Sequence, residues 1–139
     1  MSKDLRFETH GTFEWKLTEM VYECWRMRIM AEGNYKGIKR FAAAVESLYL
    51  VLPGKVKAEV EEAYKRFQAA KLGDVKLDVK LDPLQLKRLG YTVLFRNADQ
   101  LLRLIVESLD RNNLLVKAKP VKRKGEITPE EVPDYVGVS

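Results

Sequence analysis

Hydrophobic and polar positions between residues 12 and 32 follow the period of an α-helix. One group of apolar residues recurs at alternating steps of four and three, which places its members on one helix face. This group is Phe13, Leu17, Met20, Cys24, Met27 and Ala31. A second group lies on nearly the opposite face and comprises Trp15, Tyr22 and Ile29, with Trp25 near its edge. The pattern predicts a helix that is apolar around most of its circumference and therefore has more than one packing partner.

Three further segments have the helical period, and they cover residues 35–52, 55–72 and 83–110. Gly and Pro residues separate the first three predicted helices by short turns, so we expect consecutive helices to run antiparallel. The last helix has a strong start signal. Asp82 can cap it, and Gln85 stands where its side chain can reach back to the capping residue.

Residues 75–81 have a different period, because Val and Leu alternate strictly with Lys and Asp. Such alternation is typical of a β-strand and not of a helix. Two interpretations remain open. The segment is either an extended linker whose apolar side lies on the helices, or a strand paired with residues 114–119. The helix between the two segments is long enough for a parallel crossover connection.

Together these patterns predict an all-α fold, namely an antiparallel up-and-down four-helix bundle with one or two short extended segments flanking the last helix. The chain of 139 residues is long enough for one domain with its own core. We expect that domain to span residues 1–119 and to begin with an N-terminal arm. Residues 120–139 are expected to form an irregular tail that is first basic and then acidic.

Composition adds an expectation about the source. The formal net charge is +5, and Lys, Arg and Glu are abundant whereas Asn and Gln are scarce. This balance is typical of hyperthermophile proteins, so we expect a thermophilic, archaeal or viral accessory protein. No run of about 18 apolar residues occurs, and the first residues carry charges where a signal peptide would be apolar. We therefore expect a cytoplasmic protein with no membrane partner.

The sequence contains no recognisable catalytic or ligand-binding motif. His10 and Cys24 are the only residues of their kinds, which excludes a zinc site built on His and Cys. Glycine-rich phosphate loops, nucleophile elbows and His-Glu-x-x-His motifs do not occur. We expect a protein that is not an enzyme and that has no cofactor, no metal and no evident small-molecule substrate.

The first functional hypothesis is a protein–protein interaction or assembly module that associates with itself. Large aromatic and aliphatic residues on one side of a helix resemble the centre of an interface. The candidate interface residues are Trp15, Tyr22, Trp25 and Ile29. The partner would most simply be a second copy in a homodimer, and another protein is the alternative. These residues could equally pack on residues 1–11, on residues 75–81 or on the tail of the same chain.

The alternative hypothesis is an accessory protein that binds DNA or RNA without sequence specificity. Five basic residues lie within the segment 117–124, and they are Lys117, Lys119, Lys122, Arg123 and Lys124. A second basic group surrounds the first predicted turn and comprises Arg26, Arg28, Lys36, Lys39 and Arg40. Contacts of such residues with phosphates give affinity that depends on salt and not on sequence.

Overall fold

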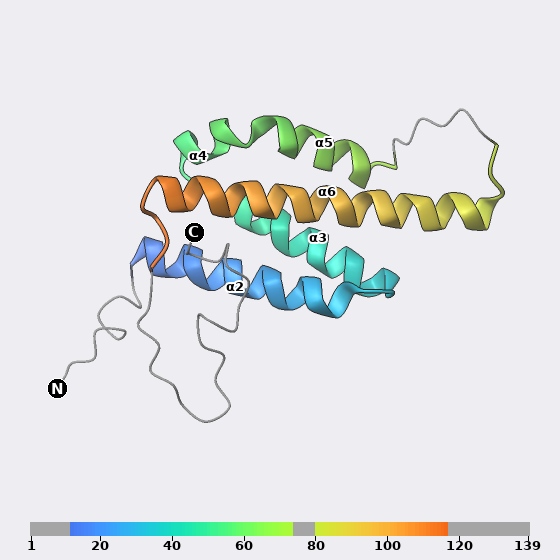
Figure 1. The fold of residues 1–139 in the computed structure, drawn as a ribbon, viewed down its shortest axis with the longest axis horizontal. Helices are drawn as coiled ribbons and strands as arrows, with labels where there is room; N and C mark the ends of the chain where they lie inside the picture. Colours follow the sequence, from blue (N-terminus) through green and yellow to red (C-terminus); the bar gives the residue numbers. More distant parts are fainter. Residues whose placement is uncertain (1–11, 74–79, 117–139) are drawn as a thin grey trace, which may run out of the picture.

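The structure is a computed structural model, and it describes residues 12–73 and 80–116 (Figure 1). These residues form the helices α2 (Phe13–Ala31), α3 (Tyr35–Leu50), α4 (Gly54–Glu59), α5 (Glu61–Lys71) and α6 (Pro83–Arg111). The predicted mostly helical class is confirmed, and these two ranges contain no β-strand. Within them, no helix combines the length and the apolar character that crossing a lipid bilayer requires.

Local capping explains where the first and last of these helices begin. The backbone N–H of Trp15 donates to Thr12 Oγ1 at 3.0 Å, which satisfies one of the donors exposed at the start of α2. At α6 the predicted capping box is present. The Gln85 N–H donates to Asp82 Oδ1 at 2.8 Å, and the Asp82 N–H donates to Gln85 Oε1 at 3.3 Å. Three of the four predicted helices therefore match observed ones within two residues at each end.

The prediction of a single helix over residues 55–72 is wrong. The chain leaves the helical conformation at Val60 (φ −113°, ψ 14°), which divides the segment into α4 and α5. Val56 and Val60 are both buried, and their spacing of four residues fits one apolar helix face. The helix axis nevertheless changes direction at Val60. No Gly or Pro marks the break, so the sequence pattern gave no sign of it.

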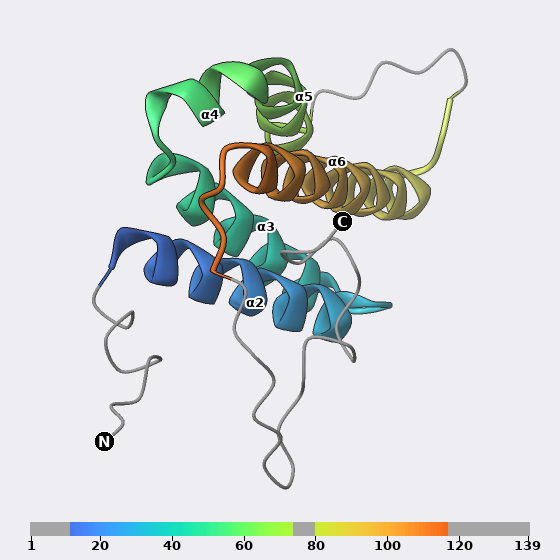
Figure 2. The ribbon, with the colours of Figure 1, turned by 60° about the vertical axis from the view of Figure 1, so that its left-hand side comes forward.

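All the other described helices contact α6. α2 and α3 pack as a hairpin on one side of α6, and α4 and α5 lie on the other side (Figures 1 and 2). α3 lies between α2 and α6 and crosses α6 obliquely (Figure 2). A regular up-and-down four-helix bundle is thus not established, because one of its predicted members is divided and the helices are not evenly aligned.

A close approach of backbones holds the α2–α3 hairpin together. A Cβ atom placed on Gly37 would lie 2.7 Å from the carbonyl oxygen of Met30 and 2.8 Å from Cα of Ala31. Aromatic pairs join α3 to its other neighbours: Phe41 packs on Phe95 of α6 with ring centroids 5.5 Å apart. The largest fully buried side chains come from all five of these helices and include Leu17, Phe41, Leu48, Phe67, Leu101 and Leu109.

After α6 the chain passes back to α2. Leu115 is buried, and the backbone N–H of Val116 donates to Thr18 Oγ1 at 2.9 Å. This contact joins the backbone that follows α6 to the first half of α2. The predicted arm 1–11, most of the alternating segment 75–81 and the tail 120–139 lie outside the described residues, so the predicted pairing of 75–81 with 114–119 stays a prediction.

Candidate interaction surfaces

The four predicted interface residues on α2 do not form one exposed face. Trp25 is only 3% exposed and lies in the core, where its ring faces the guanidinium groups of Arg28 (5.5 Å) and Arg103 (5.8 Å). Trp15 and Tyr22 are half-buried, and Ile29 is 67% exposed. Placing Trp25 at an interface therefore needs correction, because its ring already faces α6.

A polar bridge at Trp25 connects α2 to α6. Arg28 Nε donates to Asp99 Oδ1 at 2.6 Å, and Arg103 Nε donates to Asp99 Oδ2 at 3.1 Å. The guanidinium of Arg28 also lies 5.4 Å from the ring centroid of Phe95. Arg28, a member of the basic group around the first turn, thus joins α2 to α6 through charge-assisted hydrogen bonds and cation–π contacts.

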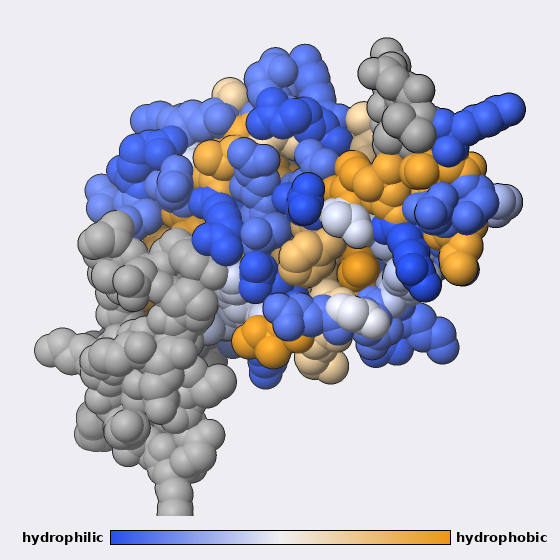
Figure 3. Space-filling view, turned by 45° about the vertical axis from the view of Figure 1, so that its right-hand side comes forward, coloured by the Kyte–Doolittle hydropathy of each residue, from blue (hydrophilic) through white to orange (hydrophobic). Residues whose placement is uncertain are grey.

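The first turns of α6 project beyond the neighbouring helices (Figure 1). Residues 82–88 are all exposed, including Leu84 (56%) and Leu86 (47%). Apolar side chains gather at this end of the molecule, with hydrophilic side chains around them (Figure 3). Exposed leucines in the projecting turn of a long helix are the strongest candidate for a contact surface in the described residues.

Two hollows lie behind this projecting turn, and Tyr91 lines both of them. Tyr91 stacks on Tyr35 with ring centroids 4.3 Å apart. The hollow between α3, the end of α5 and α6 has a volume of about 400 Å³, and we call it the Gly90 groove. The hollow between the α2–α3 turn and α6 has a volume of about 480 Å³, and we call it the Arg88 groove.

The Gly90 groove has an apolar floor and a positive rim. Its lining includes Lys39, Ala42, Ala70, Lys87, Gly90 and Leu94. Lys71 at the rim pairs with Glu46 (2.5 Å), which leaves Lys39 and Lys87 as the excess charge. In the described part of the chain, no side chain and no neighbouring element comes within 4 Å of a Cβ placed on Gly90, so packing there does not require glycine. A glycine inside a helix costs about 1 kcal/mol relative to alanine.

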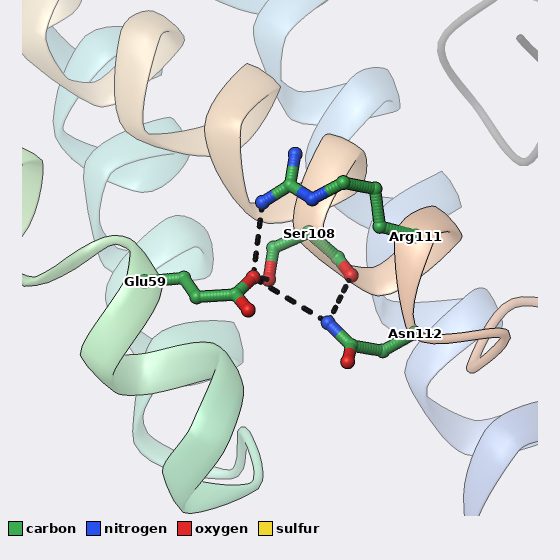
Figure 4. A network of polar contacts seen from close by, with 4 residues as sticks. All are labelled: Glu59, Ser108, Arg111 and Asn112. Atoms are coloured by element: carbon green, nitrogen blue, oxygen red, sulfur yellow. Dashed lines mark hydrogen bonds and ion pairs between the residues drawn. The ribbon is translucent and has the colours of Figure 1, made fainter.

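A second polar cluster, besides the bridge at Trp25, lies at the end of α6 away from Leu84 and has a structural role (Figure 4). Glu59 Oε1 accepts hydrogen bonds from Ser108 Oγ (2.5 Å), Arg111 Nη2 (2.9 Å) and Asn112 Nδ2 (3.4 Å). The hydrogen bond from Ser108, followed by that from Arg111, holds the pKa of the Glu59 carboxyl below its ordinary value. Because Glu59 ends α4, the cluster fastens the α4–α5 break to the last turn of α6.

The single cysteine is sequestered from solvent. Cys24 is buried, and this burial, with a smaller contribution from Glu23, raises the pKa of its thiol to about 12. A thiol of this kind remains protonated and unreactive at neutral pH. Within residues 12–73 and 80–116, no group of three or more His, Cys, Asp and Glu side chains is placed to hold a metal ion.

The basic residues proposed for nucleic-acid binding are only partly visible. Lys117, Lys119, Lys122, Arg123 and Lys124 lie outside the described residues. Of the group around the first turn, Arg26 pairs with Glu23 and Arg28 with Asp99. The remaining three, Lys36, Lys39 and Arg40, are exposed on the first half of α3.

The surface at the start of α6 is absent from the sequence prediction. Leu84 and Leu86 are not among the interface residues predicted from the sequence, and α6 continues without a break through Gly90. The available signal was a glycine inside an otherwise strong helix pattern, together with Leu86, which lies off the main apolar face of the helix. Comparison of the chain with protein-family models, with curated proteins and with solved structures finds no match.

Proposed function

We propose that this chain is a non-enzymatic protein–protein interaction or assembly module that associates with a second copy of itself through the start of α6. The observation that carries the proposal is the projecting first turn of α6, where Leu84 and Leu86 are exposed next to the Gly90 groove. Burying one leucine side chain contributes about 1.5–3 kcal/mol. Leu84 and Leu86 of each copy would therefore contribute about 3–6 kcal/mol to a symmetric dimer, against the entropic cost of association.

Helix α6 is already ordered at this surface, which favours association. The Asp82–Gln85 capping box fixes its first turn, so little backbone entropy is lost when a partner binds. Gly90 adds a second feature, because a backbone without a side chain allows a partner to approach α6 closely. The contact would be isologous, as in most homodimers, with each α6 start facing that of the other copy.

Sedimentation velocity of the full chain over a range of micromolar concentrations tests this proposal. The wild type is expected to form a dimer, and Leu84→Glu is expected to weaken dimerisation about tenfold or more, because a charge replaces a buried side chain. Leu50→Glu is the matched control, since Leu50 is equally exposed at the far end of α3. Ile29→Glu tests the α2 face in the same way.

The outcomes separate the surfaces. A wild type that remains monomeric throughout refutes self-association, and a dimer that survives Leu84→Glu but not Ile29→Glu moves the interface to α2. Equal losses in Leu84→Glu and Leu50→Glu would show a general effect of added charge. Circular dichroism of each variant checks that the helices remain folded.

Binding of DNA or RNA is the second candidate function, and one observation favours it. Lys36, Lys39 and Arg40 of α3 are exposed, and Lys39 lines the same groove as Lys87 of α6, so positive charge from two helices meets there. Fluorescence anisotropy with labelled duplex DNA and single-stranded RNA at about 50 and 200 mM salt tests this function. Binding that is lost at the higher salt and in Lys39→Glu supports it, and no binding at the lower salt removes it.

A further inference from the structure

The Arg88 groove combines an aromatic floor with an arginine side chain in its wall. Half-buried or buried apolar side chains form the floor, namely Tyr35, Ile38, Tyr91 and Phe95. Arg88 lines one wall. Arg96 lies one turn after Thr92 of the lining and is itself outside it. Both arginines are exposed, and neither makes an ion pair with another residue of the described ranges. Glu32 is the acidic residue of the lining.

This combination selects a particular kind of occupant. An arginine guanidinium binds carboxylates in a planar, bidentate geometry, and an aromatic floor favours apolar side chains. The occupant should therefore be a segment in which carboxylates and aliphatic or aromatic side chains alternate over a short length and positive charge is absent.

The sequence of this chain contains such a segment. Residues 126–139 carry four carboxylate side chains and no Lys or Arg. The carboxylates are those of Glu126, Glu130, Glu131 and Asp134. The apolar residues between and after them are Ile127, Val132, Tyr135, Val136 and Val138. Charge and side-chain chemistry are thus complementary to the Arg88 groove.

The place where the described chain ends puts this segment within reach. Val116 is held on α2 by its hydrogen bond to Thr18, and the Arg88 groove begins at the far end of α2, near Ala31. Ala31 is thirteen positions after Thr18 in the helix, a distance of about 20 Å. The nine residues 117–125 can span up to about 30 Å. A tether of this length gives an effective concentration of the order of millimolar.

We propose that residues 126–139 bind the Arg88 groove of their own chain. Their carboxylates pair with Arg88 and Arg96, and their apolar side chains cover Tyr91 and Phe95. The proposal does not depend on self-association through Leu84 and Leu86, because the Arg88 groove lies on the other side of Tyr91 from the Gly90 groove.

Paramagnetic NMR of the full chain tests the proposal. A nitroxide label attached to Ser139→Cys reacts selectively, since Cys24 is buried. At about 50 mM salt we expect the amide signals of Glu32, Arg88 and Thr92 to lose more than half of their intensity. Signals from Lys65 on α5 serve as the reference, because this residue lies on a helix that does not line the Arg88 groove.

Charge exchange identifies the contact. Arg88→Glu with Arg96→Glu is expected to abolish the broadening, and adding Glu130→Lys with Glu131→Lys is expected to restore it. Arg66→Glu, an exposed substitution on α5, is the matched control and should leave the broadening unchanged. The same spectra show whether each variant remains folded, and Arg88→Gln with Arg96→Gln replaces the double reversal if that variant unfolds.

Three results would overturn the proposal. The first is no broadening at the groove in the labelled wild type. The second is broadening that the charge reversals leave unchanged. The third is equal broadening in a ¹⁵N-labelled chain mixed with a spin-labelled, unenriched chain, which would make a second copy the occupant.

Discussion

Two glycines inside helices should respond in opposite ways to the same substitution. Alanine is favoured over glycine in a helix interior by about 1 kcal/mol, so Gly90→Ala is expected to stabilise the protein by about that amount. Among the described residues, no side chain and no neighbouring element lies within 4 Å of the added methyl group, so no packing cost from them offsets the gain. For a domain of this size the melting temperature should rise by roughly 4 °C.

Gly37→Ala adds the same methyl group where α2 and α3 meet. The new Cβ would lie 2.7 Å from the Met30 carbonyl oxygen, and ordinary contact begins near 3.4 Å, so the two backbones must separate by about 0.7 Å. Overpacking of this kind costs about 1–3 kcal/mol, and rigid backbone atoms place the cost in the upper part of that range. After the gain in helix propensity, a net loss of about 1–2 kcal/mol is expected.

Urea unfolding followed by circular dichroism measures both variants against the wild type. The two free energies of unfolding should differ by about 2–3 kcal/mol, with an unchanged dependence on urea. Gly37→Ala with wild-type stability would contradict the close α2–α3 contact. A destabilising Gly90→Ala would mean that another part of the chain packs on Gly90, and the Gly90 groove would then be closed in the folded protein.

Three further predictions concern side chains that hold the fold together. The Cys24 thiol should not react with a disulfide reagent at about pH 8 in the native chain but should react fully in denaturant. The free energy of unfolding should also fall as the pH rises above about 9 towards the raised pKa of about 12, because the buried thiol then ionises more easily in the unfolded chain. The Glu59 pKa is lowered by folding, so its ionised form stabilises the native state at neutral pH, and this contribution is lost as the pH falls through that pKa. Thermal unfolding should therefore show Glu59→Gln less stable than the wild type at neutral pH and nearly equal to it in acid, and a deficit that persists in acid would refute the ionic role. Arg28→Lys should lower the free energy of unfolding by about 1 kcal/mol, since an ammonium group cannot both stack on Trp25 and bind Asp99 in the planar geometry of a guanidinium. An unchanged midpoint of urea unfolding would count against that arrangement.

The sequence pattern predicted those features that depend on local spacing. The positions of α2, α3 and α6 follow from the recurrence of apolar residues and from turn residues between the helices. The Asp82–Gln85 capping box follows from the chemistry of residues three positions apart. Such features need no knowledge of the partner helices.

Features that depend on tertiary contact could not be predicted in this way. The position of Trp25 against α6 is decided by Arg103, which is 78 positions later in the sequence. The break at Val60 is decided by the attachment of Glu59 to Ser108 and Arg111. Val56 and Val60 both keep the helical period in the sequence, so the pattern gives no sign of the break. The exposure of Leu84 and Leu86 arises because α6 is longer than its neighbours, which only the assembled helices show (Figure 1).

The division of α6 into a projecting start and a buried remainder has a consequence for local opening. Residues 82–88 are exposed and rely on their own hydrogen bonds and capping box, whereas Leu101, Ile105 and Leu109 are buried in the core. Amide hydrogens should therefore exchange rapidly in the first two turns and at the rate of global unfolding in the last three. One unbroken helix would then contain a gradient of opening free energy, from close to zero at Leu84 to the full stability of the protein at Ile105.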